Sequence, residues 1–167
     1  MVIILGYYFD LKGPDRKQIA LVAEQLKNRL QEKCNCDTIL ATDDLVILSG
    51  DPLKHNLYFE LFQTKTVGKL YFKADLHIGN YTEEFLEWNY PSFEDFCDAL
   101  IEKSALFYNK KIKIIRRKKA FKGMETEFVD ISNDKARSLC KTEFYSFLLA
   151  IVTFKTEENE CEYDFRI

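Results

Sequence analysis

The sequence predicts an α+β fold: a single globular domain over residues 1–167, with a mainly antiparallel sheet of about six to eight strands and two principal helices packed on one face. Three observations carry this prediction. Residues 69–78 alternate between apolar and polar types without a break, which is typical of a strand with one buried face. Two other stretches place apolar residues at helical spacing. The 14 Phe and 9 Tyr residues favour sheet.

The chain begins with an apolar run, Val2–Phe9, that we expect to form a strand buried on both faces. A helix should follow over about residues 14–33. Pro14 suits the first helical position, and apolar residues between Ile19 and Leu30 recur every three or four residues.

A hairpin built around residues 69–78 should form the centre of the sheet. Residues 57–63 are also rich in β-prone types, and the connection 64–68 has the length of a hairpin loop and ends in a glycine. Two shorter strands, 38–42 and 45–49, should precede this hairpin.

The segment 79–90 shows no clear periodicity, and we expect an irregular connection with one helical turn. Ser92 can cap a second helix over residues 93–108, where apolar side chains again follow helical spacing. Residues 110–119 and 125–131 should then pair as another hairpin that turns at 122–124.

The last part of the chain leaves alternatives open. Ser132 can cap a short helix over 134–140, and residues 144–154 either continue it or form a strand. We favour the strand, because residues 161–167 alternate cleanly and need a strand to pair with.

Composition limits the classes of partner. The net charge of −3 and pI near 5.5 oppose binding to nucleic acid or an anionic membrane. The apolar run at the N-terminus is too short for a signal peptide, and no apolar stretch approaches 18 residues, so we expect a cytoplasmic protein without a membrane segment. Five cysteines in such a protein should be reduced thiols.

Catalytic chemistry has little support in the sequence. The spacing of the cysteines and of His55 and His77 does not match a structural zinc site, and no nucleophile, phosphate-binding or dinucleotide-binding motif occurs. We therefore name no catalytic residue, metal or cofactor. Whether the protein is an enzyme stays open, with the balance against it.

Four aromatic residues in the segment 79–90 form one candidate partner-binding surface. They lie among three glutamates, and aromatic residues ringed by charge are typical of interface hot spots. The residues are Tyr81, Phe85, Trp88 and Tyr90. The alternative is that these rings simply pack against the core beneath a loop.

The basic run 110–119 is the second candidate surface, because seven of its ten residues are Lys or Arg. In a strand, four of these cations would form a positive stripe on one side: Lys111, Lys113, Arg117 and Lys119. Such a stripe could contact an acidic protein or phosphates. The alternative is internal pairing with the acidic stretch 156–164, at about 0.2–1 kcal/mol per cross-strand pair.

Two functions follow from these surfaces. The first is a small non-enzymatic protein-binding module, such as an inhibitor or immunity-type protein that neutralises another protein. The second is a nucleic-acid-binding protein or an enzyme that uses the basic strand, and the acidic balance of the chain makes nucleic acid the less favoured partner. The identity of the partner and the oligomeric state do not follow from the sequence.

Overall fold

The computed structural model describes residues 15–49, 57–66, 68–119, 123–144 and 157–166. Contacts between Cα atoms divide the chain into two compact units, Met1–Tyr108 and Asn109–Ile167. The described residues form two helices and nine strands, so the predicted α+β class and antiparallel pairing are confirmed. The strands make two sheets, of five and four strands, where the sequence predicts one sheet of six to eight. That the whole chain forms one domain stays a prediction.

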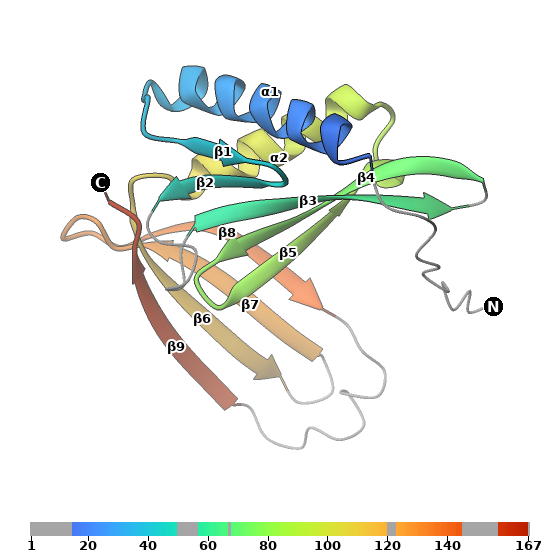
Figure 1. Cartoon of the computed structure of the whole chain (residues 1–167). Coiled ribbons are helices and arrows are strands. Elements are labelled where there is room, and N and C mark those ends of the chain that lie inside the picture. Colours follow the sequence, from blue (N-terminus) through green and yellow to red (C-terminus); the bar gives the residue numbers. More distant parts are fainter. Residues whose placement is uncertain (1–14, 50–56, 67, 120–122, 145–156, 167) are drawn as a thin grey trace. The chain divides into compact units, whose positions relative to one another are not determined.

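The first unit contains a five-stranded meander and both helices (Figure 1). Its elements are α1 (Arg16–Cys34), β1 (Leu40–Thr42), β2 (Leu45–Ser49), β3 (Leu57–Thr66), β4 (Lys69–Ile78), β5 (Tyr81–Leu86), the 3₁₀ helix η1 (Glu87–Asn89) and α2 (Phe93–Phe107). The strands lie in the sheet in chain order, each antiparallel to the next. Short connections favour this arrangement, because only antiparallel neighbours can be joined by a tight turn.

Both principal helices are confirmed, with ends set by capping residues, although α1 begins at Arg16 and not at Pro14. The Asp15 carboxylate accepts the N–H groups of the first turn of α1, and Asn35 ends the helix in a left-handed conformation, φ 50°. Ser92 caps α2 through the N–H of Asp95, as expected. The helices contact one another, and α1 also contacts β1 to β3 while α2 contacts β3 to β5. That both pack on one face of the sheet stays a prediction.

The predicted central hairpin is confirmed. β3 and β4 pair along ten residues each, from Leu57 opposite Ile78 to Thr66 opposite Lys69. The turn is shorter than expected and includes Gly68 at φ 81°, a conformation that favours glycine. The alternate residues of β4 from Phe72 to Ile78 are buried, as their spacing predicts.

The irregular connection expected over 79–90 is wrong in its first half. Residues 81–86 form β5, and only the expected helical turn, η1, remains. The turn before β5 is the pair Gly79-Asn80, with Gly79 at φ 59°. A glycine followed by asparagine is a two-residue hairpin signal, so the sequence contained the information that β5 follows β4.

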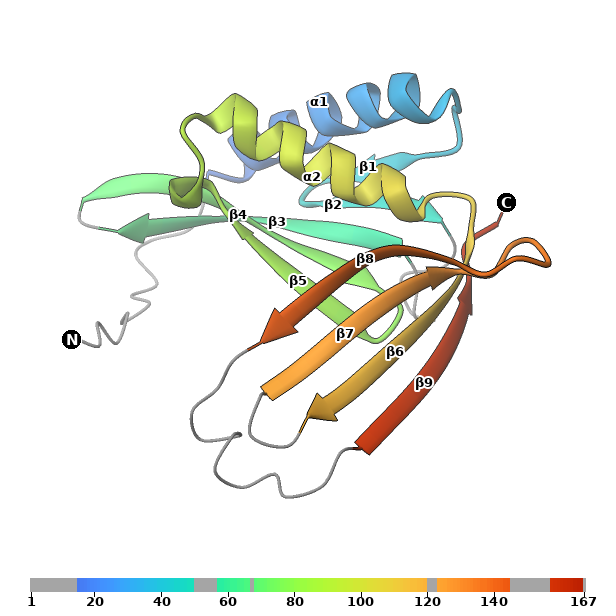
Figure 2. The same ribbon diagram turned by 180° about the vertical axis from the view of Figure 1, so that it is seen from behind.

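The second unit is a four-stranded antiparallel sheet in the order β8-β7-β6-β9 (Figure 2). Its strands are β6 (Lys111–Lys119), β7 (Gly123–Asp130), β8 (Arg137–Phe144) and β9 (Glu157–Asp164). The predicted hairpin of β6 and β7 is confirmed by their register, which runs from Ile112 opposite Asp130 to Lys119 opposite Gly123.

The short helix expected over 134–140 is wrong. Residues from Arg137 onward pair with β7 as β8, and the Ser132 hydroxyl accepts the N–H of Lys111 at 2.8 Å instead of capping a helix. The expected strands at Val2–Phe9 and over 145–154 lie outside the described residues, as does His55. Within the described part of the chain, neither helix combines the length and apolar character that crossing a membrane requires.

Candidate partner-binding surfaces

The structure separates the four aromatic residues of the first candidate surface. Tyr81 lies opposite Ile78 and Phe85 opposite Ala74, so both rings project to the face of the sheet that carries the core residues of β4. Phe85 is 6% exposed. Phe85 therefore has the packing role that the sequence left as the alternative, and Tyr81 is half-buried on the same face.

Tyr90 also packs inward. Its ring meets the buried ring of Phe96 edge-on, with centroids 5.9 Å apart, and Phe96 belongs to α2. Burial, with the negative charge of Glu83 as a smaller cause, raises the pKa of the Tyr90 hydroxyl. Tyr90 thus joins the end of η1 to α2 and offers only part of its ring to a partner.

Trp88 is the exposed member of the four, at 38%. Its ring contacts Tyr71 of β4 edge-on, with a centroid distance of 5.6 Å and an interplanar angle of 81°. The neighbouring Glu87 fixes this position, because its carboxylate accepts the Phe72 N–H at 2.6 Å just beyond the last pair of β4 and β5. The glutamate holds η1 against β4 and leaves the indole at the surface.

Trp88 belongs to a larger aromatic face that the sequence did not reveal. Phe62 lies opposite Lys73 and Thr64 lies opposite Tyr71, so Phe62 and Tyr71 project from the same side of β3 and β4 as diagonal neighbours. We call Phe62, Tyr71 and Trp88 the aromatic face. The sequence contains one sign of this face: Tyr71 is an aromatic residue at a position of residues 69–78 that the alternation assigns to the polar side.

The basic stripe of β6 is largely neutralised within the second unit. The acidic strand β9 lies beside β6, with Lys113 opposite Glu162 and Arg117 opposite Glu158. Lys113 pairs with Glu160 at 3.0 Å, and Lys111 pairs with Glu162 at 3.3 Å. This is the internal pairing that the sequence offered as the alternative. Lys119 lies in β6, but its side chain is outside the described residues.

Arg117 is the centre of this charged face. Its guanidinium donates to Glu127 at 2.7 Å, Glu158 at 2.8 Å and Glu125 at 3.3 Å. Glu127 also accepts from the Ser138 hydroxyl at 2.8 Å. These hydrogen bonds, above all the one from Arg117, hold the pKa of the Glu127 carboxyl at about 2.

The low pKa of Glu127 predicts a loss of stability in acid. Its pKa in the unfolded chain is near 4.5, so the ionised carboxylate stabilises the folded state above that pH, and the stabilisation disappears as pH falls from about 4.5 to 2. After allowance for solvent screening, we expect Glu127→Gln to remove on the order of 1–2 kcal/mol at pH 7 and almost nothing at pH 2. Urea unfolding of both proteins over this range measures the difference, and a constant gap between them would contradict the linkage.

Thiols and imidazoles are not gathered into a reactive site in the described residues. Burial raises the pKa of the Cys97 thiol to about 12, which suppresses its nucleophilic form. His77 stacks on Tyr58 with ring centroids 4.4 Å apart, and its Nδ1 lies 3.1 Å from the Thr82 hydroxyl. The described part of the chain contains no group of three or more Cys, His, Asp or Glu side chains suited to hold a metal.

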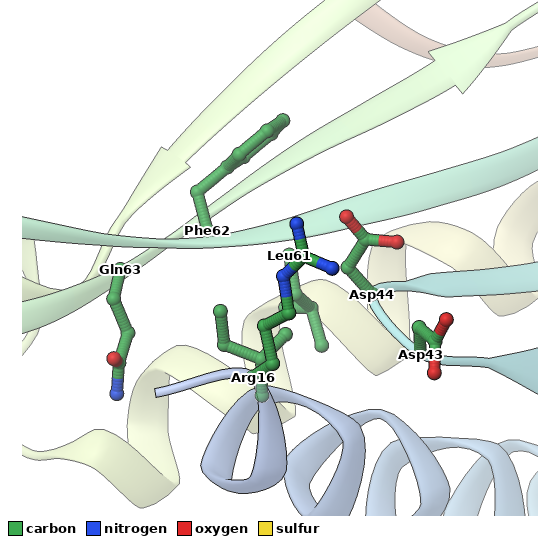
Figure 3. Close-up of a pocket in the computed structure, with 7 residues that line it drawn as sticks. Arg16, Asp43, Asp44, Leu61, Phe62 and Gln63 are labelled. Atoms are coloured by element: carbon green, nitrogen blue, oxygen red, sulfur yellow. The ribbon is translucent and has the colours of Figure 1, made fainter. Parts of the chain in front are cut away.

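A pocket of about 320 Å³ opens beside β3, where the turn between β1 and β2 approaches it (Figure 3). Charged and polar groups come from Arg16, Asp43, Asp44 and Gln63, and apolar atoms from Ile19, Leu61 and Phe62. Gln63 ties the pocket to the start of α1, because its side-chain amide accepts the Asp15 N–H at 3.1 Å and donates to Gln18 at 2.7 Å. The sequence places Ile19 on the apolar side of a helix, but it assigns none of these residues to a binding site.

No model of a known protein family matches the chain. Comparisons with curated proteins and with solved structures likewise find no match.

Proposed function

We propose that the protein is a small non-enzymatic protein-binding module, of the kind that inhibits or neutralises another protein, and that it works in the cytoplasm. The observation that supports it most is the aromatic face, with Trp88 exposed at the end of the sheet and held there by Tyr71 and Glu87. A reducing compartment suits the five cysteines, which are present as thiols and not as disulfides.

The aromatic face has the properties of an interface hot spot. Trp and Tyr are the residue types most enriched at such positions, because a large rigid ring buries much apolar surface at little cost in conformational entropy. Trp88 is also set in place before binding, by its contact with Tyr71 and by the hydrogen bond from the Phe72 N–H to Glu87. A partner would therefore gain affinity without first ordering this side chain.

The basic strand gives less support to a nucleic-acid partner. Lys111, Lys113 and Arg117 each form ion pairs with carboxylates of the same sheet. A phosphate would have to displace these carboxylates, which lowers the gain expected from counterion release. A protein partner at the aromatic face needs no such exchange.

Replacing Trp88 by alanine tests this proposal. We expect the affinity for the natural partner, recovered from native lysate and then purified, to fall by about 2 kcal/mol or more, which is about 30-fold in Kd. Isothermal titration calorimetry measures the change. Because Trp88 is the only Trp in the chain, its fluorescence should also shift to shorter wavelength when the partner covers it.

The matched control is Leu21→Ala, which removes an exposed apolar side chain of α1 in the same unit, 60% accessible, and should leave the affinity unchanged. Tyr90 is better changed to phenylalanine than to alanine, since its ring packs on Phe96. If the partner binds the Trp88→Ala variant as tightly as it binds the parent protein, the aromatic face is not part of the binding site.

A further inference from the structure

The edge of β3 that faces β2 is only partly paired. β2 pairs with β3 from Leu57 to Glu60, and the next outward N–H, that of Leu61, donates to the Asp44 carbonyl at 2.8 Å. Outward backbone groups alternate along an antiparallel strand, so the N–H and C=O groups of Gln63 and Lys65 point the same way. No described residue pairs with this edge beyond Leu61.

The pocket of Figure 3 lies at the same edge. The Arg16 guanidinium and the Asp44 carboxylate point into one space beside β3, and Asp43 lies next to them. Neither aspartate forms an ion pair with a described residue. Two carboxylates against one guanidinium leave the pocket with an excess of negative charge beside the apolar atoms of Leu61 and Phe62.

We propose that this edge accepts an extended strand of the partner protein, and that one Lys or Arg side chain of that strand enters the pocket and reaches Asp43 and Asp44. This inference rests on the proposed function. Strand addition would satisfy the outward groups of Gln63 and Lys65, while the pocket would select the side chain. The long stem of a Lys or Arg fits apolar walls with its charge at the far end.

Phe62 takes part in both surfaces: it lines the pocket at the edge of β3, and its ring projects away from Arg16, to the face of the sheet that carries Tyr71 (Figure 3). A partner could therefore add its strand on one side of β3 and cover Tyr71 and Trp88 on the other. In this arrangement Arg16 should weaken binding of the partner strand, because its positive charge competes with the incoming cation for Asp44. Removing that charge should strengthen binding, whereas removing either aspartate should weaken it.

The test uses a displayed library of random eight-residue peptides selected on the full chain. We expect the selected peptides to share one Lys or Arg. Binding of a synthetic selected peptide should fall at least tenfold with Asp43→Asn combined with Asp44→Asn, and rise several-fold with Arg16→Gln. Lys65→Pro removes one outward N–H and should also abolish binding, while Lys65→Ala keeps that N–H and should preserve it.

Amide hydrogen exchange of the isolated chain completes the test. The Gln63 and Lys65 amides should exchange rapidly in the free protein and slowly with the peptide bound. Protection in the free protein that is independent of concentration would mean that the chain's own residues occupy the edge, and protection that grows with concentration would mean a second copy. Either result overturns the inference, as do selected peptides without a shared basic residue.

The inference and the proposed function can fail separately. If the natural partner loses affinity with Trp88→Ala but not with Asp43→Asn, Asp44→Asn or Lys65→Pro, the binding module stands and strand addition is wrong. If a selected basic peptide binds the edge but the affinity of the natural partner is unchanged by Trp88→Ala, the edge is a binding site and the aromatic face is not.

Discussion

Replacing Phe96 by alanine is expected to lower the free energy of unfolding by about 3–5 kcal/mol. Phe96 of α2 is fully buried, and its ring contacts those of Tyr90 and Phe93 at centroid distances of 5.9 and 6.0 Å. Its removal takes away the transfer free energy of the ring and leaves a cavity that neighbouring rings can only partly fill. Urea unfolding followed by circular dichroism measures the loss.

The control for Phe96 is Trp88→Ala, which removes a larger ring that is 38% exposed and should cost clearly less than Phe96→Ala. Comparing the two variants distinguishes an aromatic side chain that holds α2 in place from one that is available to a partner. Equal losses in the two variants would mean that Trp88 is a core residue, and its exposure in the structure would then carry no argument for binding.

The central part of the fold could be predicted because its signals are local. The unbroken alternation of residues 69–78 sets which side chains of β4 are buried, and the capping residues Asp15 and Ser92 mark where the helices begin. Such signals depend on neighbours a few positions apart, which a single sequence displays directly.

One error arose where pairing with another strand, and not a local signal, decided the structure. The local sequence from Ser132 onward predicts a capped helix. The residues from Arg137 instead pair with β7 and form β8. Division of the strands between two sheets is likewise a property of long-range contacts. In β5, by contrast, the Gly79-Asn80 turn was a local signal, and the mixed aromatic and acidic residues that follow obscured it.

The candidate surfaces show the same limit. Sequence alone could count the cations of residues 110–119 and the acids of residues 156–164, but only the register of β6 with β9 shows that Lys113 faces Glu162 and Arg117 faces Glu158. The aromatic face depends on contacts between β4 and η1, so Tyr71 could not be joined to Trp88 in advance. Trp88 itself was named because its residue type is frequent in interfaces.

The second large effect is expected at Arg117. Methionine in its place keeps most of the side-chain volume but leaves Glu125, Glu127 and Glu158 close together without their shared cation. Glu125 and Glu127 are nearly buried, with side-chain exposures of 11% and 12%, so water cannot fully replace the guanidinium. We expect Arg117→Met to lose about 2–4 kcal/mol of stability at pH 7.

The pH dependence of this variant distinguishes lost charge from lost packing. Without Arg117 the pKa of Glu127 should rise from about 2, so acid can neutralise the crowded carboxylates, and the deficit of Arg117→Met should shrink as pH falls below about 4.5. Lys113→Met is the control, because its partners Glu160 and Glu162 are exposed and such a pair contributes less than about 1 kcal/mol. Urea unfolding at pH 7 and pH 3 compares the variants, and a deficit for Arg117→Met that stays the same at both values would show that the side chain acts through packing and not through its charge.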